Sequence, residues 1–451
     1  MLLSTELIEL VAQSCDSIQD RARLATLNRK WHAACVRSLF QRVVIHSPRQ
    51  CAAFFRHLDD FYKRGWLSYV HQLDLSSFTA RGSGWTEAQA NELICPKRMG
   101  KLLGGCTRVR ELYVGEQVMS AFVDPDVLRV VFLQCSRLQV LDFCGCCDAK
   151  FAGAMTKVIE EEPKKRIDSL HSASFYMCMS LKQSSFFIPF FKKTTRLVRL
   201  DLSHSRITSD LFTHIDPTAL THLSLQGCHG ITCCNTPLVP FLHRATALVE
   251  LNLTMAFNGM PTSQFCSFCL VRILQAIGSN MPFLHTLHLG GHIHLDDGVL
   301  SHLQSSTLYR LARLSLASSP SITLYGLLTH VIDRAPKLYY LNIADTPLAL
   351  DFTKYLMMLL ERCNNIQVIE VGNVTDNYVR GDHPKEWQSV WSLITHGRRT
   401  YYSRAHATTT TNKDTSSSSA LMDPRFVCSN KLPMTNCIPD SPMLKYWCYS
   451  Y

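Results

Sequence analysis

Two cysteines and two histidines follow one another in an order that could bind a metal ion. The cysteines form the pair Cys266-x-x-Cys269, and His285 and His288 come after them. Thiolates and imidazoles at short spacings are the usual ligands of zinc. We expect His288, however, to point from the inner face of a strand, whereas the cysteine pair lies in a helical segment on the outer side. The sequence therefore predicts no metal site and no cofactor.

A cysteine nucleophile is the other chemistry that the chain could offer. Cys437 lies near the end of the chain, after the low-complexity stretches 408–411 and 416–419. A segment of this composition cannot bury a core around a catalytic thiol. We therefore expect a protein that is not an enzyme.

The charge and hydropathy patterns exclude two further classes of protein. The net charge is +10, but the densest basic patches are only the short stretches 163–166 and 396–399. Nucleic-acid binding usually needs a concentrated basic stripe with interleaved aromatic residues. The longest apolar stretches, 186–191 and 355–360, are far shorter than the roughly 18 residues of a membrane span. We expect neither a nucleic-acid partner nor a membrane span.

A short apolar pattern, L-x-x-L-x-L with conservative replacements, recurs through most of the chain. It occurs eleven times, beginning at Val70, Val109, Leu138, Ile167, Leu197, Leu220, Leu248, Leu284, Leu311, Leu338 and Ile366. The intervals between successive starts are 39, 29, 29, 30, 23, 28, 36, 27, 27 and 28 residues. Most of them lie near the 20 to 29 residues that are typical of leucine-rich repeats.

The spacing within each unit predicts how the repeats fold. The last two apolar residues of the pattern lie two positions apart and share one face of a short strand. Helical apolar spacing follows the strand, as in 324–332 and 355–360. Units of this kind bury their apolar faces only by stacking. We therefore expect an α/β fold, a curved leucine-rich-repeat solenoid with an inner parallel sheet and outer helices.

The cysteine content fits this interpretation. The 19 cysteines cannot all pair within the chain, and the first residues lack the basic and apolar regions of an export signal. Reduced thiols predict a cytoplasmic or nuclear protein. The unit that begins at Leu220 resembles the cysteine-containing subclass of leucine-rich repeats, in which the cysteine packs inside the turn. We expect this structural role for Cys228 and Cys146.

The first 45 residues show two amphipathic helical patterns. Ser4 is a plausible N-cap for a stripe of Leu7, Ile8 and Val11, and a second stripe holds Leu24, Leu27 and Trp31. Three short helices bury too little surface to be stable alone. We expect a partner protein or the first repeat to cover their apolar face.

The order of these residues resembles the F-box. The matching residues are Leu3, Glu6, Leu7, Val11, Asp20, Leu24, Arg29 and Trp31. Three positions depart from the family pattern: Ser4 stands where the family has Pro, Arg21 where it has Leu, and Leu27-Asn28 where Val-Cys is common. The stretch 38–43 resembles the segment after the box in many fungal F-box proteins.

An F-box followed by leucine-rich repeats resembles the substrate receptors of SCF-type ubiquitin ligases. This resemblance covers nearly the whole chain, and it implies a non-catalytic subunit of the ligase. The box would bind a Skp-type adaptor and through it a cullin, while the repeats hold a target protein near the ubiquitin-loaded enzyme. The residues that it assigns to adaptor binding are Leu3, Glu6, Leu7, Val11, Leu24, Leu27 and Trp31.

The residues between the paired apolar positions should line the concave face of the solenoid and bind the target protein. The candidates there, with the adjacent Tyr340, are Asp74, Tyr113, Asp142, Asp201, Asn252, His288, Tyr340 and Asn342. The preceding row of outward positions adds Glu111, Arg199, His222, Glu250 and Arg313. Asp or Asn at the first set of positions is also common for bonding at strand ends, so both roles stay open. The aromatic candidates, with the neighbouring Tyr339, would anchor the target.

The sequence thus predicts four segments. These are an F-box-like domain at 1–45, a solenoid of about eleven repeats at 46–372, a cap at 373–402 and a low-complexity tail at 403–451, which we expect to be disordered with an aromatic end. The spacing of Trp387, Trp391 and Ile394 predicts a helix in the cap. Two alternatives remain: the first 45 residues could be a helical cap on the first repeat, or the chain could be a stand-alone protein-binding scaffold. Burial of Leu3, Leu7 and Val11 against the first repeat would favour these alternatives.

Overall fold

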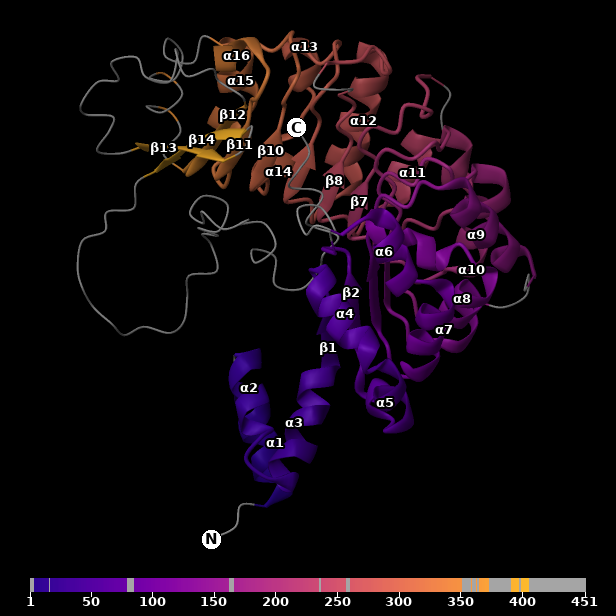
Figure 1. Ribbon diagram of the computed structural model, residues 1–451. Coiled ribbons are helices and arrows are strands. Elements are labelled where there is room, and N and C mark those ends of the chain that lie inside the picture. The colour runs from indigo at the N-terminus through magenta and orange to yellow at the C-terminus, as the bar shows by residue number, and fades with distance from the viewer. Residues whose placement is uncertain are drawn as a thin grey trace, which may run out of the picture. The chain divides into compact units, whose positions relative to one another are not determined.

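The computed structural model describes residues 4–15, 17–78, 85–161, 166–234, 237–256, 260–350, 358, 362, 365–372, 391–396 and 399–404. The chain divides into two compact units, Met1–Arg199 and Leu200–Tyr451. Each unit consists of short parallel strands that alternate with helices (Figure 1). No helix among the described residues is both long enough and apolar enough to cross a lipid bilayer.

The first unit begins with three helices and continues into the repeats. Its helices are α1 (Thr5–Ser14), α2 (Ile18–Leu24), α3 (Arg29–Gln41), α4 (Pro48–Arg56), α5 (Leu58–Lys63), η1 (Trp66–Tyr69), α6 (Glu87–Leu93), α7 (Pro96–Gly105), η2 (Glu116–Phe122), α8 (Pro125–Arg129), η3 (Val130–Gln134), α9 (Ala149–Glu161), η4 (Gln183–Phe187) and α10 (Ile188–Lys193). Its strands are β1 (Arg42–Val44), β2 (Gln72–Leu75), β3 (Glu111–Val114), β4 (Val140–Phe143) and β5 (Ser172–Ser174), and β6 (Arg199–Asp201) starts at its last residue.

The second unit continues the alternation and ends in a hairpin. Its helices are η5 (Ser209–Thr213), α11 (Leu238–Arg244), α12 (Ser267–Asn280), α13 (Asp297–Leu300), α14 (Ser305–Leu308), α15 (Leu324–His330), η6 (Ile332–Arg334) and α16 (Pro347–Leu350). Its strands are β7 (His222–Ser224), β8 (Glu250–Asn252), β9 (Thr286–His288), β10 (Arg313–Ser315), β11 (Tyr340–Asn342), β12 (Val368–Gly372), β13 (Trp391–His396) and β14 (Arg399–Arg404). In Figure 1 the strands β7 to β11 lie side by side, with α11, α12 and α15 on the other side of the repeats.

The strand register explains why the leucine pattern folds in this way. The central leucines of successive strands are aligned: Leu73 pairs with Leu112 and Leu112 with Leu141 in the first unit. Leu223, Leu251, Leu287, Leu314, Leu341 and Ile369 form the same row in the second unit. All of them are buried. Each repeat therefore completes its core on its neighbour. The eleven strands expected from the sequence are β2 to β12, and the leucine-rich-repeat fold is confirmed.

One strand comes earlier than the sequence indicated. β1 follows α3 without an intervening residue and pairs in parallel with β2, with Val43 opposite Leu73. An aromatic cluster packs α3 onto the first repeat: the Phe40 ring lies 5.0 Å from that of Phe61 and 5.6 Å from that of Trp66. The first 45 residues therefore already contain the first strand of the sheet, and α3 runs directly into it.

The turns after the strands are held by one recurring hydrogen bond to the preceding repeat. The Cys228 thiol donates to the Leu202 carbonyl over 3.0 Å, and the Cys178 thiol donates to the Phe143 carbonyl over the same distance. His292 fills the position with an imidazole, whose Nε2 lies 3.0 Å from the Leu253 carbonyl. The structural role predicted for Cys228 is confirmed, and Cys146 is likewise fully buried.

The C-terminal end of the described chain differs from the expected helical cap. Residues 391–396 form β13, which pairs antiparallel with β14, and β14 pairs antiparallel with β12. The helix expected at Trp391 and Ile394 is therefore wrong, because both segments of the hairpin are rich in β-branched and aromatic residues that favour strands. Trp387 and the tail after residue 404 lie outside the described residues.

Candidate adaptor-binding and target-binding surfaces

Helix α1 is apolar on two faces, and only one of them is covered. Ile8 and Ala12, one turn apart, are buried where α1 packs against α3. Leu7, Leu10 and Val11 lie on a different stripe and are 49%, 57% and 43% exposed. In a globular protein, the side of a helix that faces water normally carries polar residues. The exposed stripe is therefore a candidate contact surface for another protein.

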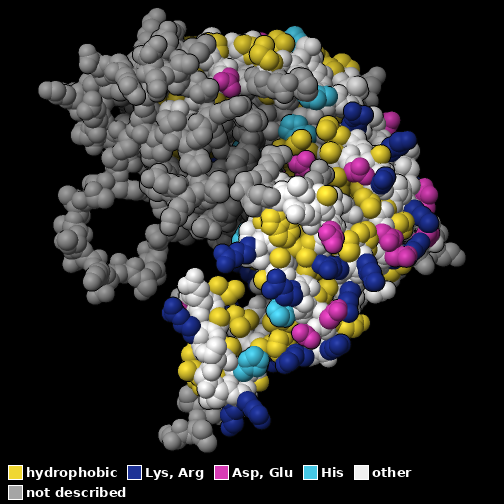
Figure 2. All heavy atoms as spheres, viewed as in Figure 1, with side chains coloured by type: hydrophobic (Ala, Val, Ile, Leu, Met, Phe, Trp, Pro, Cys, Tyr) yellow, Lys and Arg dark blue, Asp and Glu magenta, His cyan; other side chains and the backbone are white. Residues whose placement is uncertain are grey.

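The neighbouring turn and helix extend the apolar area. Ile18, the first residue of α2, is 60% exposed, and Leu27, in the turn before α3, is 61% exposed. Leu24 and Trp31 are half-buried. Figure 2 shows hydrophobic side chains along these N-terminal helices, interspersed with Lys and Arg. We call Leu7, Leu10, Val11, Ile18 and Leu27 the N-terminal apolar face.

The structure explains the three departures from the F-box pattern. Ser4 is the N-cap of α1, and its hydroxyl accepts a bond from the Leu7 amide at 3.4 Å. The Arg21 guanidinium donates to the Cys15 carbonyl over 2.9 Å and so holds the end of α1. Asn28 caps α3 by accepting from the amides of Lys30 and Trp31. Each unusual residue thus stabilises a helix end.

Glu6 keeps its charge at the start of α1. Hydrogen bonds from the backbone of Glu6 and from the Ser4 hydroxyl lower the pKa of the Glu6 carboxyl. A carboxylate in the first turn also interacts favourably with the positive end of the helix. A negative charge therefore lies at one end of the N-terminal apolar face, and the role predicted for Glu6 in adaptor binding stays a prediction. Leu3 lies outside the described residues.

The expected helix through Leu24, Leu27 and Trp31 is interrupted. Helix α2 ends at Leu24 and α3 begins at Arg29, so Leu27 lies in a turn. Two residues of the N-terminal apolar face, Leu10 and Ile18, were missing from the sequence-based set. The spacing of Leu10 from Leu7, three residues along the helix, was the signal that could have identified it.

The residues predicted to bind a target protein are mostly not exposed. Seven of them are buried, namely Asp74, Tyr113, Asp142, Asp201, Asn252, Tyr340 and Asn342, whereas His288 is half-buried. The exposure expected for these side chains is therefore not found. Their role in target binding stays a prediction.

The buried carboxylates and amides on this face share one structural role. In each case Oδ1 accepts the backbone N–H two residues later: Asp74 from Ser76 at 3.0 Å, Asp142 from Cys144 at 2.9 Å and Asp201 from Ser203 at 2.9 Å. Asn252 and Asn342 accept from Thr254 and Ala344 in the same way. These bonds satisfy amides where each strand turns away. The geometry therefore favours the alternative role of these side chains, which is hydrogen bonding at the strand end.

The predicted aromatic anchors are also engaged within the protein. The Tyr113 hydroxyl donates to Glu111 Oε2 over 2.9 Å, and burial raises the pKa of Tyr113. The Tyr340 hydroxyl donates to Glu370. The side chains of the preceding row of outward positions are more accessible than these buried candidates. The half-buried residues of that row are Glu111, Arg199, His222, Glu250 and Arg313. Across that row, His222 Nε2 lies 3.7 Å from Glu250 Oε2.

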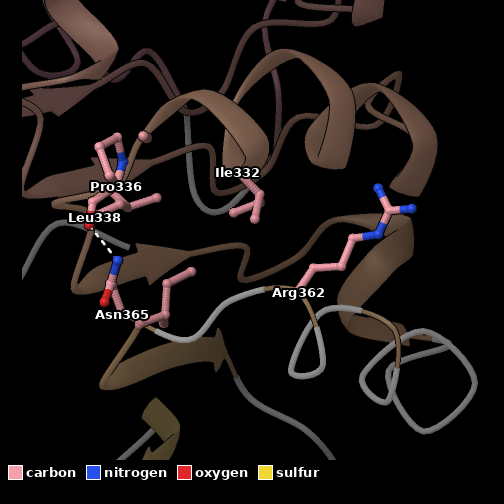
Figure 3. A pocket seen from close by; sticks show the side chains of 7 residues that line it. Ile332, Pro336, Leu338, Arg362 and Asn365 are labelled. Carbon is pink, nitrogen blue, oxygen red and sulfur yellow. Dashed lines mark hydrogen bonds between the residues drawn. The ribbon is translucent and has the colours of Figure 1, made fainter.

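A small pocket lies between the last two repeats, on the helical side (Figure 3). Its lining residues are Ile332, Ala335, Pro336, Leu338, Arg362, Asn365 and Ile366. The Asn365 amide donates to the Pro336 carbonyl, and Arg362 pairs with Asp333 at 3.2 Å. Its polar groups are therefore occupied in holding adjacent repeats together.

Comparison with known proteins places the chain near fungal F-box proteins. It is 25% identical to the F-box protein YLR352W of Saccharomyces cerevisiae over 231 residues, which cover 46% of this chain. The match spans only 28% of the length of that protein. No family model matches the chain. The chain thus resembles a fungal F-box protein.

Two solved structures share the general architecture. One is the yeast complex of Rad7 and Elc1, with a TM-score of 0.45 and 14% identity over 83% of this chain and 89% of the other. The second is the leucine-rich-repeat protein LegL7 of Legionella pneumophila, with a TM-score of 0.37 and 16% identity over 60% of this chain and 86% of the other. Because both TM-scores are below 0.5, the assignment of the fold rests on the strand register described above.

Proposed function

We propose that this protein is a substrate receptor of a cullin-based, SCF-type ubiquitin ligase. The N-terminal apolar face binds a Skp-type adaptor and through it a cullin, and the repeats bind a target protein. The receptor itself performs no chemistry and acts by holding the target near the ubiquitin-loaded enzyme. We place this activity in the cytoplasm or the nucleus, where thiols such as those of Cys228 and Cys178 stay reduced.

The observation that carries the proposal is the exposure of Leu7, Leu10 and Val11 on a helix whose other apolar face is already packed. Had the helices been a cap on the first repeat, Leu7 and Val11 would be covered. The exposed stripe therefore supports the receptor over the stand-alone scaffold. The similarity to a fungal F-box protein supports the same choice.

We propose that the target protein binds to the sheet side of the repeats. It contacts the more accessible row of side chains at the starts of the strands. This row holds both charges within each unit, Glu111 and Arg199 in the first and Glu250 and Arg313 in the second. A partner segment of mixed charge would suit it, because complementary charges fix the register of an interface more than its affinity.

Binding of a purified Skp-type adaptor tests the proposal. We expect the wild-type chain to bind at micromolar concentration or below. The double variant Leu7→Asp, Val11→Asp should bind at least about 100-fold more weakly, because two central apolar contacts are replaced by charges. Both side chains are largely exposed, so the thermal midpoint of the free protein should hardly change.

A matched control separates adaptor binding from a general effect of added charge. Tyr325 and Phe283 are 74% and 58% exposed in the second unit. The variant Tyr325→Asp, Phe283→Asp should bind the adaptor as the wild type does. Failure of the wild-type chain to bind any Skp-type adaptor, measured by calorimetry at tens of micromolar, would disprove the receptor function.

A further inference from the structure

Four cysteines of the second unit bring their sulfur atoms together between two consecutive repeats. Cys233 and Cys234 lie between β7 and α11, and Cys266 and Cys269 lie at the start of α12. All four Sγ atoms lie within 4.8 Å of one another. The four residues are free thiols. The chain thus gathers, from positions more than thirty residues apart, the donor set of a four-thiolate metal site.

The distances between the sulfur atoms fit a tetrahedral ion. Sγ of Cys233 lies 3.4 Å from that of Cys234, 3.2 Å from that of Cys266 and 3.3 Å from that of Cys269. Sγ of Cys234 lies 4.0 Å from that of Cys266 and 3.6 Å from that of Cys269. Zinc with Zn–S bonds of about 2.3 Å holds tetrahedral sulfurs about 3.8 Å apart, whereas a disulfide requires about 2.05 Å.

The backbone at Cys234 has a conformation that serves this arrangement. Its φ is 59°, in the left-handed region that residues with side chains rarely adopt. Neighbouring side chains in an extended segment point in opposite directions. The left-handed turn lets Cys233 and Cys234 approach α12 together. Unusual backbone of this kind is concentrated at binding sites.

The second cysteine pair lies where a helix favours negative sulfur. Cys266 is the N-cap residue of α12, and Cys269 lies in the first turn of this helix. The positive end of a helix stabilises thiolates.

Backbone amides also point at the sulfur atoms. The Cys266 amide donates to Cys233 Sγ over 3.2 Å, and the Cys234 amide donates to Cys269 Sγ over 3.1 Å. Bonds of this kind orient the ligands of a metal and spread their charge. Gln264 adds a polar link between the same two repeats by donating to the Cys228 carbonyl over 3.0 Å.

We propose that Cys233, Cys234, Cys266 and Cys269 bind one zinc ion that fastens two consecutive repeats together. Four thiolates leave no open coordination position, so the role of the ion is structural. The sequence-based expectation of no metal considered only His285 and His288 as partners of the Cys266-x-x-Cys269 pair. The second pair, Cys233-Cys234, completes the donor set, and the fold alone brings it there.

The proposal is tested by metal analysis of the full-length protein. We expect purified protein to retain one zinc ion per chain. Replacement of the ion by cobalt(II) should give a sulfur-to-cobalt charge-transfer band and the intense visible bands of a tetrahedral site. The variant Cys266→Ser, Cys269→Ser should lose the zinc, and the milder Cys234→Ser should bind it at least about tenfold more weakly.

A control variant removes two thiols elsewhere. Cys95 and Cys147, half-buried and exposed, lie outside the cluster, so Cys95→Ser, Cys147→Ser should keep the full zinc content. Circular dichroism checks that each variant is folded. The proposal is overturned if the folded wild type takes up no zinc, if it holds iron instead, or if the control loses as much zinc as the cluster variants. A disulfide between the two pairs, found by mass spectrometry in zinc-treated protein, would also overturn it.

Discussion

At the scale of single residues, chemically different side chains do the same work in the turns. Cys178 and Cys228 each donate from a thiol to a carbonyl of the preceding repeat, and His292 does so from an imidazole. A buried carbonyl left without a donor costs about 1–3 kcal/mol. Any compact hydrogen-bond donor, thiol or imidazole, can therefore occupy this position in the turn. His292 differs from the cysteines in one respect, since its imidazole can take up a second proton in acid.

The His292 imidazole should make the protein sensitive to acid. Burial lowers the pKa of His292 to about 4. The neutral ring is favoured in the folded state, so its contribution to stability is complete above pH 6.5 and is lost as the pH falls toward 4. The loss should amount to about 3 kcal/mol.

The variant His292→Cys keeps a donor but removes this titration. The free energy of unfolding should then fall less between pH 7 and pH 4.5 than in the wild type, as measured by urea denaturation. His302→Cys, at an exposed position, is the control and should retain the pH dependence of the wild type. An identical pH dependence in His292→Cys and the wild type would contradict the assignment.

Hydrogen bonding within the repeats also explains why the exposure expected for the target-binding candidates was not found. The strand pattern correctly places Asp142, Asp201 and Asn252 between two buried apolar residues. It does not reveal that each side chain turns back to accept the amide two residues later. That bond depends on where the strand ends, and the ends of short strands are set by tertiary packing.

At the scale of elements, a glycine turn in the second unit leaves no room for a side chain. Gly291 has φ of 82°, and a Cβ atom on it would lie 2.1 Å from the backbone nitrogen of Ala256. Any side chain there displaces the neighbouring repeat. Gly153, on the exposed side of α9, has open space around it.

Alanine at these two glycines should therefore have opposite effects. Gly291→Ala should lower the free energy of unfolding by about 3 kcal/mol or more, because both the conformation and the space are unsuitable. Gly153→Ala should raise it by about 0.5–1 kcal/mol, since alanine favours the helix. Thermal and urea unfolding measure both. Equal small effects at the two positions would show that the close approach at Gly291 is relaxed in solution.

The repeated strands could be predicted from sequence, whereas the two ends of the sheet could not. β2 to β12 follow from the leucine period, including β5, which belongs to the degenerate unit that begins at Ile167. β1 lacks that period, and its formation depends on the neighbouring β2. The segment at Trp391 has helical spacing but pairs as a strand with β14, which itself pairs with the open edge of β12.

At the scale of the whole molecule, the feature that matters most for the proposed function is the direct passage from α3 into β1. Helix α3 ends at Gln41 and the strand starts at Arg42. The aromatic packing of Phe40 against Phe61 and Trp66 reinforces this joint. We therefore expect the N-terminal helices and the first repeat to move as one body, which the proposed proximity catalysis would favour.

A flexible insertion at this joint should separate binding from ubiquitin transfer. Six Gly-Ser residues between Gln41 and Arg42 should leave adaptor affinity within about threefold of the wild type, because the N-terminal apolar face is unchanged. In a reconstituted ligase, the lysines of the receptor that become ubiquitylated should form a broader set, as mapped by mass spectrometry. An unchanged pattern of modified lysines would show that the rigid joint plays no part in transfer.

The position of β1 also has a consequence for how the protein is made. Translation runs from the N-terminus, so β1 is available as a pairing edge before the leucine-rich repeats that follow it have emerged. The strand of each later repeat in the first unit can pair with a strand that has already formed. This pairing requires no residue that is still to be translated. Nascent chains that end after β2, β3 or β4 should therefore already hold their strands in native register.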